Sequence, residues 1–205
     1  MPRIRAATID EHKELTRRAL LDAAFRLIEE AGTAEIPLGE VALAAGVGRT
    51  TFYDYFEDRD DVIASLVEDK LPAVIAGLIE KVPSELPPED RLARLSAATV
   101  EFVATDPVFG VILHREVGRM GLEAQRRIRE SHADLATELA AVYRLGVSEG
   151  VFRSIPPFLA GRLIQDTIMS AGRTLIEDET RRGVVTAEVV EFLLGGLSKR
   201  SSTQG

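Results

Sequence analysis

The chain from residue 41 to residue 56 reads VALAAGVGRTTFYDYF, and its spacing predicts two short helices joined by a tight turn. Ala42 is small enough to let two helices cross closely, Gly46 can turn the chain, and Val47 can fill the angle between the helices. We therefore expect one helix on each side of the turn, arranged as a helix-turn-helix.

The second of these helices, residues 49–56, is expected to present a polar face outward. Phe52 and Phe56 stand four residues apart and share one face, which should point inward. The remaining side chains then face outward at various angles: Arg49, Thr50, Thr51, Tyr53, Asp54 and Tyr55. With its first turn in a major groove, such a helix can offer arginine to guanine edges. Its threonines suit thymine methyl groups or phosphates, and its tyrosine hydroxyls suit phosphates.

Helical periodicity continues on both sides of this pair, with a short helix over residues 38–45 and a longer one before it. The first helix is expected to run from about Glu11 to a glycine cap at residue 32. A fourth helix begins after Asp58 as its N-cap, and Pro72 should kink or end it. The proline-rich stretch 81–88 reads as a loop.

The sequence shows no alternating pattern typical of strands, so it predicts an all-α fold. Beyond the loop we expect helices that start at Pro88 and at Asp106-Pro107, one long helix from Leu122 to the glycines at 146–150, a helix from about residue 157 to residue 179, and a last helix from Thr186 as its cap to about Lys199. On the outer face of the long helix, three arginines are expected to be solvated: Arg126, Arg127 and Arg129.

The run from residue 32 to residue 62 closely resembles the DNA-binding domain of the TetR (tetracycline repressor) family of bacterial transcription regulators. The resemblance is carried by Glu30-Ala31-Gly32, Val41-Ala42, Ala45-Gly46-Val47, Thr51-Phe52-Tyr53, Tyr55-Phe56 and Arg59, where the family usually has Lys. Residues 145–153, LGVSEGVFR, look like the family's usual turn before its last two helices. The resemblance implies about nine helices, with a three-helix DNA-binding domain at residues 1–57 and a ligand-binding and dimerisation domain at residues 58–205.

Several positions depart from the family's pattern and bear on the operator sequence rather than on the fold. Ile36-Pro37 and Gly48 stand where hydroxyl side chains commonly cap the second and third helices, so two phosphate-binding hydroxyls are missing. Tyr55 replaces the more usual His. Asp54 either accepts a hydrogen bond from a cytosine amine, pairs with a neighbouring cation or points away from DNA.

The net charge of −8, from 25 basic and 33 acidic residues, does not by itself favour a nucleic acid partner. Residues 1–18 are locally basic, with Arg3, Arg5, Lys13, Arg17 and Arg18 against three acidic residues. We therefore expect a DNA footprint with few cations and a shallow salt dependence. The predicted DNA contacts are Lys13, Arg49, Thr50, Thr51, Tyr53, Tyr55 and Arg59.

The last two predicted helices are apolar nearly all round, and one chain cannot cover both of their faces. Two such helices from each of two chains would form a four-helix interface, as the resemblance implies. A two-fold dimer would then place its recognition helices about 34–36 Å apart on palindromic double-stranded DNA. The alternative is that the two helices close a monomeric core.

A ligand cavity for a small-molecule inducer is predicted in the larger domain. Its expected apolar walls are Phe102, Phe109, Leu113, Leu135, Leu139, Tyr143 and Met169, and its possible polar anchors are His114, His132, Gln165, Asp166 and Arg173. A histidine on an apolar stripe, such as His132, can equally be a hydrogen-bonded core residue. Gln165 and Asp166 can instead belong to the dimer interface.

Enzymatic function is not expected. The sequence has no cysteine, no glycine-rich phosphate loop, no His-Glu-x-x-His or Gly-x-Ser-x-Gly motif, and its three histidines lack metal-ligand spacing. We expect no metal, cofactor or membrane contact and a cytoplasmic location, since no apolar run approaches about 18 residues. The expected function is a dimeric repressor released by its inducer; the alternative is a helical small-molecule-binding protein without DNA binding.

Overall fold

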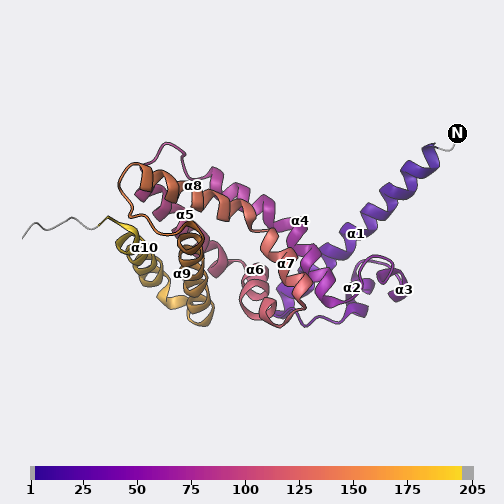
Figure 1. Ribbon diagram of the computed structural model, residues 1–205. Coiled ribbons are helices and arrows are strands. Elements are labelled where there is room, and N and C mark those ends of the chain that lie inside the picture. The colour runs from indigo at the N-terminus through magenta and orange to yellow at the C-terminus, as the bar shows by residue number, and fades with distance from the viewer. Residues whose placement is uncertain (1–2, 200–205) are drawn as a thin grey trace, which may run out of the picture. The chain divides into compact units, whose positions relative to one another are not determined.

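The structure is a computed structural model that describes residues 3–199, apart from the side chains of residues 3–8, 107, 157 and 179. Its α-helices are α1 (Arg3–Ala31), α2 (Leu38–Ala44), α3 (Arg49–Phe52), α4 (Arg59–Glu80), α5 (Pro88–Thr105), α6 (Pro107–Val111), α7 (Leu122–Glu130), α8 (Ala133–Ser148), α9 (Pro157–Glu177) and α10 (Arg182–Leu197) (Figure 1). A π-helix, η1 (Ile112–Glu116), and two 3₁₀ turns, η2 (Val117–Arg119) and η3 (Glu179–Arg181), complete the helical elements. The predicted all-α fold is confirmed. The side chains of Arg3 and Arg5, which were predicted to reach DNA, lie outside the described residues.

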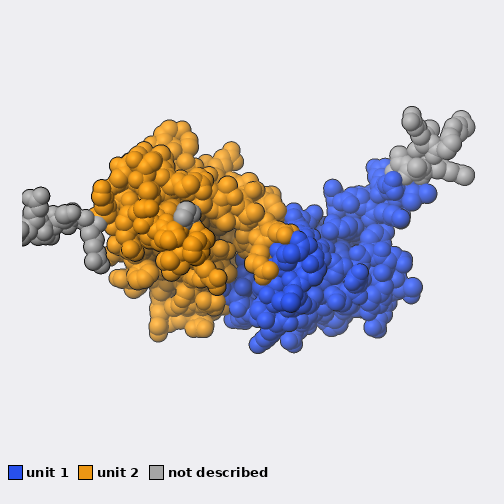
Figure 2. All heavy atoms as spheres, in the orientation of Figure 1, with its two compact units in different colours: residues 1–70, 107–128 blue, residues 71–106, 129–205 orange. Residues whose placement is uncertain are grey.

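The chain forms two compact units (Figure 2). Unit 1 contains residues 1–70 and 107–128, and unit 2 contains residues 71–106 and 129–205. Segment 107–128 thus packs with the N-terminal helices although it lies far along the chain. The functional division predicted at residue 57 is a separate matter and stays a prediction.

Buried apolar side chains of α1, α2, α3 and α4 form the core of the N-terminal part of unit 1. Helix α1 contributes one apolar face, with Leu20, Leu21 and Ile28 fully buried, and it ends at Ala31, directly before Gly32. Gly32 has a φ of 63°, and its amide donates to the carbonyl of Ile28 at 2.9 Å. This left-handed C-terminal residue is the glycine cap that the sequence predicted.

The predicted turn between α2 and α3 is also confirmed. Gly46 has a φ of 73°, and the amide of Val47 donates to the carbonyl of Ala42 at 2.9 Å. Helix α3 ends at Phe52, earlier than predicted, because the next amides form i→i+3 bonds: Tyr53 donates to the Thr50 carbonyl at 3.1 Å. The chain therefore tightens from an α-helix into successive turns before Phe56.

Helix α4 begins as predicted and continues past Pro72. The amide of Asp61 donates to the side chain of Asp58 at 2.9 Å, so Asp58 caps the helix. Pro72 does not end α4, which continues to Glu80. Leu71 and Ile75 are buried on either side of this proline, and their packing compensates for one missing backbone hydrogen bond.

The long helix predicted from Leu122 to the glycines is wrong, because the chain breaks at Ser131-His132 between α7 and α8. The amide of His132 bonds back to the Arg129 carbonyl at 3.2 Å, and its own carbonyl accepts from Ala136 at 3.1 Å. His132 is thus the N-cap residue of α8. The apolar stripe continues in phase across the break, so hydrophobic periodicity does not reveal it.

In unit 2, helix α5 packs on α8, α9 and α10. Helix α10 begins at Arg182, after the turn η3, so the cap predicted at Thr186 lies inside the helix and is wrong. Among residues 3–199, no single helix is long and apolar enough to cross a membrane; Pro88–Thr105 and Val108–Arg119 reach that length and composition only when counted together.

Candidate DNA-binding surface

Two buried phenyl rings fix the segment that follows the turn. Phe52 is 0% and Phe56 2% exposed, and their ring centroids lie 5.6 Å apart. The guanidinium carbon of Arg17, on α1, lies 5.8 Å from the centroid of the Phe56 ring. These contacts hold residues 49–56 against α1 and leave the opposite side of the segment open to solvent.

The residues on that open side are those that the sequence predicted. Arg49, Thr50, Tyr53 and Asp54 are exposed, with Tyr53 at 48%, while Thr51 and Tyr55 are half-buried. A guanidinium, hydroxyls and a phenol therefore occupy a short surface that is open to solvent. Side chains of these types bind base edges and phosphate oxygens of duplex DNA.

Helix α1 borders this surface along a groove of about 590 Å³. Its lining residues are Asp10, Lys13, Glu14 and Arg17 of α1, with Thr51, Asp54 and Tyr55. Lys13 thus lies beside residues 49–56, the recognition segment, although it is far away in sequence. Asp54 shares the groove with the cations Lys13 and Arg17 and with the carboxylates of Asp10 and Glu14, so its role at the DNA surface stays a prediction.

Arg59, also predicted as a DNA contact, is engaged within unit 1. Its guanidinium lies 3.8 Å from carboxylate oxygens of both Glu116 and Asp60, and its side chain is 31% exposed. Glu116, at 5% exposure, has little access to water. The charge of Arg59 therefore compensates a buried carboxylate, and its phosphate contact stays a prediction.

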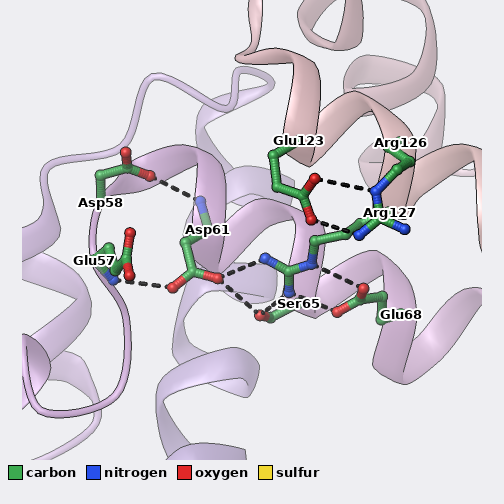
Figure 3. A network of polar contacts seen from close by, with 8 residues as sticks. All are labelled: Glu57, Asp58, Asp61, Ser65, Glu68, Glu123, Arg126 and Arg127. Atoms are coloured by element: carbon green, nitrogen blue, oxygen red, sulfur yellow. Dashed lines mark hydrogen bonds and ion pairs between the residues drawn. The ribbon is translucent and has the colours of Figure 1, made fainter.

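Behind the surface, Arg127 of α7 binds three side chains of α4 (Figure 3). Its nitrogens lie 2.7 Å from the carboxylate of Asp61, 2.7 Å from the hydroxyl of Ser65 and 2.6 Å from the carboxylate of Glu68. The prediction that Arg127 is solvated is wrong. Asp61, Ser65 and Glu68 recur at helical spacing, and this one-sided polar stripe was the signal that a cation packs against α4.

Burial of Asp61 by itself would raise the pKa of its carboxyl. Hydrogen bonds from Arg127, from the Glu57 amide and from Ser65 outweigh burial and hold this pKa below the ordinary value of 3.8. Hydrogen bonds to Glu68 and Asp61 likewise raise the pKa of Arg127 above its ordinary value, against the effect of burial. Asp61 and Arg127 are therefore both ionised at neutral pH.

Two models of known protein families match this chain. A family model described as "Bacterial regulatory proteins, tetR family" matches residues 20–66, and one described as "Tetracyclin repressor-like, C-terminal domain" matches residues 85–173. The chain belongs to the TetR family. It is a DNA-binding transcriptional regulator.

Relatives of this TetR-family regulator share most of its length. The fatty acid metabolism regulator protein of Bacillus subtilis is 23% identical over 184 residues, which cover 88% of this chain and 95% of that protein. The crystal structure of FadR from Bacillus subtilis in complex with stearoyl-CoA has a TM-score of 0.73 at 23% identity and covers 87% of this chain and 98% of that one. AibR in complex with isovaleryl coenzyme A and operator DNA has a TM-score of 0.64 at 14% identity, with 87% and 98% covered.

The predicted ligand-binding residues of this TetR-family chain fall into both units. Phe109, Leu113 and His114 belong to unit 1; Phe102, His132, Leu139, Tyr143, Gln165 and Met169 belong to unit 2. Phe109 is buried, with its ring edge-on to Phe25 at 6.4 Å between centroids. His114 lines a hollow of about 500 Å³ with Glu35, Glu116 and Arg119.

In unit 2, Phe102, His132 and Met169 are half-buried and Leu139 is buried, whereas Gln165 is exposed on α9. Tyr143 has a structural role: its ring stacks on Phe152 at 6.2 Å between centroids. Its hydroxyl accepts from the Ile155 amide at 2.7 Å. The predicted residues do not line the open groove of about 940 Å³ between α5 and α10. No cluster of possible metal ligands occurs among the residues that the structure describes.

Helices α9 and α10 leave large apolar side chains uncovered. Phe158 is 82% exposed and Leu163 46% on α9, and Val184 is 67% and Phe192 70% exposed on α10. Isolated exposed apolar residues are ordinary, but five of them on the two neighbouring C-terminal helices, with Leu159 at 38% as the fifth, are not. These are the two helices whose sequences, apolar nearly all round, predicted faces that one chain cannot cover.

Proposed function

We propose that this TetR-family regulator represses transcription as a homodimer on a palindromic operator and that a small-molecule inducer releases it. The observation that carries the proposal is the surface of Arg49, Thr50 and Tyr53, which stand exposed above the buried rings of Phe52 and Phe56. Membership of a family of DNA-binding regulators decides against the alternative of a ligand carrier without DNA binding.

In the proposed complex the N-terminal turn of α3 enters the major groove. Arg49 reads guanine edges, Thr50 and Thr51 meet a thymine methyl group or a phosphate, and the tyrosines bind the phosphate backbone. Lys13, which borders the same groove as Thr51 and Tyr55, adds a phosphate contact from α1. A plot of the logarithm of the affinity against the logarithm of the salt concentration should fall with a slope of roughly 0.9 per phosphate contact. Since these cations are few, the total slope should be shallow.

Two protomers are proposed to dimerise through α9 and α10, because these helices carry exposed apolar side chains. A two-fold axis would bring the α9–α10 pairs of two chains together as four helices and present two recognition helices to consecutive turns of DNA. Gln165, exposed on α9, fits this interface as well as it fits a ligand contact.

The inducer is proposed to contact the apolar residues of unit 2 on α5, α8 and α9, which pack on one another. Phe102, Leu139 and Met169 supply apolar surface and His132 a polar group. Two relatives of the same fold were crystallised with acyl-coenzyme A thioesters, stearoyl-CoA and isovaleryl coenzyme A. This class is therefore the first to test.

Selection of bound fragments from random DNA duplexes tests the proposal. We expect a palindromic consensus bound by two protomers, which electrophoretic mobility and mass measurement of the complex will show. Recovery of no consensus above background would refute the repressor assignment. Addition of stearoyl-CoA or isovaleryl-CoA to the selected complex then tests the inducer class, with free coenzyme A as the control.

A further inference from the structure

Figure 3 shows a series of hydrogen bonds that leads from α7 to the end of the recognition segment. Arg127 donates from Nη1 to Oδ1 of Asp61 at 2.7 Å, and the other carboxylate oxygen, Oδ2, accepts from the backbone amide of Glu57 at 2.9 Å. Glu57 directly follows Phe56, the buried ring that ends the recognition segment. Arg127 is thus one carboxylate away from the backbone at residues 56–57.

The geometry of Arg127 suits a rigid connection. Its guanidinium binds Asp61, Ser65 and Glu68, which lie along nearly two turns of α4. The side chains of Arg127 and Asp61 are only 22% and 24% exposed, so water and salt weaken this pair less than a surface pair. A planar guanidinium that binds three acceptors has one allowed orientation.

The neighbouring residue provides a contrast. Arg126 pairs with Glu123 of its own helix, one turn earlier, and these side chains are 51% and 70% exposed. A pair of this kind contributes little to stability and does not connect two elements. The two adjacent arginines of α7 therefore differ in environment and in partner.

The position of Arg127 in the chain gives this connection a consequence. It lies within the stretch that matches the C-terminal domain of the family, residues 85–173, yet it packs in unit 1. The chain passes from Ile128 in unit 1 to Arg129 in unit 2 directly after it. A side chain from the stretch that matches the family's C-terminal domain therefore holds the backbone at residues 56–57, where the recognition segment ends.

We propose that Arg127 is a positioning residue for operator recognition: through Asp61 it fixes the backbone at Glu57 and so the angle at which Arg49–Tyr55 meet DNA. Arg127 itself does not touch DNA. The inference rests on the proposed DNA binding and uses the operator selected above. If the wild-type protein selects no operator, the proposed function is refuted; the role of Arg127 is tested only by its variants on a selected operator.

The test compares Arg127→Met with Arg126→Met in the full-length protein on the selected operator. We expect Arg127→Met to weaken specific binding about tenfold and Arg126→Met to change it less than twofold. Because no phosphate contact is lost, the salt dependence of Arg127→Met should equal that of the wild type, whereas loss of a direct contact would reduce its slope by roughly 0.9. Arg127→Lys, which keeps the charge but not the planar guanidinium, should lie between these results.

Three further variants separate positioning from stability: Asp61→Ala, the double variant Arg127→Met/Asp61→Ala, and Glu68→Gln. Asp61→Ala should weaken operator binding as Arg127→Met does, and the double variant should be no weaker than either one. Glu68→Gln removes the charge and one of the two carboxylate oxygens that bind Arg127 but leaves the contact of Asp61 with Glu57 in place, so it should lower Tm and weaken operator binding clearly less than Asp61→Ala does. Hydrogen exchange at the Glu57 amide should accelerate in Arg127→Met and in Asp61→Ala but not in Glu68→Gln. Additive losses, equal losses from Glu68→Gln, or wild-type affinity of a folded Arg127→Met would each overturn the proposal.

Discussion

The guanidinium of Arg59 lies 3.8 Å from the carboxylate of Glu116, whose side chain is 5% exposed. Arg59 opens α4 and Glu116 ends the π-helix of segment 107–128. Together with the amide of Gly121, which donates to Asp60 at 2.8 Å, this pair attaches the segment to the first turn of α4. A residue predicted to contact DNA thus has a partner inside the protein.

Arg59→Ala should lower the free energy of unfolding by about 1–3 kcal/mol, because it leaves the carboxylate of Glu116 buried without its cation. Urea denaturation monitored by circular dichroism will measure the loss. The double variant Arg59→Ala/Glu116→Gln should regain most of it, since no buried charge remains. A single variant as stable as the wild type would show that the pair contributes nothing.

Arg49→Ala and Tyr53→Phe should affect DNA binding in different ways. Loss of a guanidinium that reads a base should cost about 1–3 kcal/mol and relax the preference at one operator position. Loss of the Tyr53 hydroxyl, which binds phosphate in the proposed complex, should weaken binding to all DNA sequences alike. Fluorescence anisotropy with the operator and with single-base variants of it will separate the two effects; if Tyr53→Phe binds as the wild type does, its phosphate contact is wrong.

Acid should remove the contribution of Asp61 to stability. Since the pKa of this carboxyl is lower in the folded protein than its ordinary value of 3.8, its stabilisation is fully present above about pH 4. It is lost as the pH falls through the lower pKa of the folded state. Asp61→Asn should therefore be less stable than the wild type at pH 6, and the difference should narrow toward pH 3. Urea midpoints at the two pH values will test this; a constant difference would argue against the ionised pair.

Gly146→Ala should destabilise unit 2, because a Cβ at this position would overlap the ring of Phe152. Overpacking of this kind costs about 1–3 kcal/mol when the neighbour cannot move, and Phe152 is itself buried and stacked on Tyr143. Gly77→Ala is the matched control, since a Cβ there meets no atom within 4 Å and alanine favours the helix. Thermal unfolding should show a lower Tm for the first variant and an equal or higher Tm for the second.

Local signals predicted the parts of this fold that depend on them. Gly32 and Gly46 mark the two turns by their positive φ, and the spacing of Phe52 and Phe56 predicted the buried side of the recognition segment. The pairing of Arg127 with α4 joins residues 59 to 66 positions apart in sequence, and helical periodicity contains no information about such contacts. The same limit explains why the sequence did not predict the ion pair of Arg59 with Glu116.

Phe158→Glu should convert the dimer to a monomer if α9 and α10 form the interface. A carboxylate in the centre of an apolar interface would be desolvated without a partner, which costs more than the contacts it replaces. Leu122→Glu is the matched control, since Leu122 on α7 is exposed to the same 82% and lies outside those helices. Sedimentation velocity should give half the mass for the first variant and the wild-type mass for the second. Operator affinity should fall when the dimer is lost, because a monomer contacts only one half-site. A Phe158→Glu protein that stays dimeric would place the interface elsewhere.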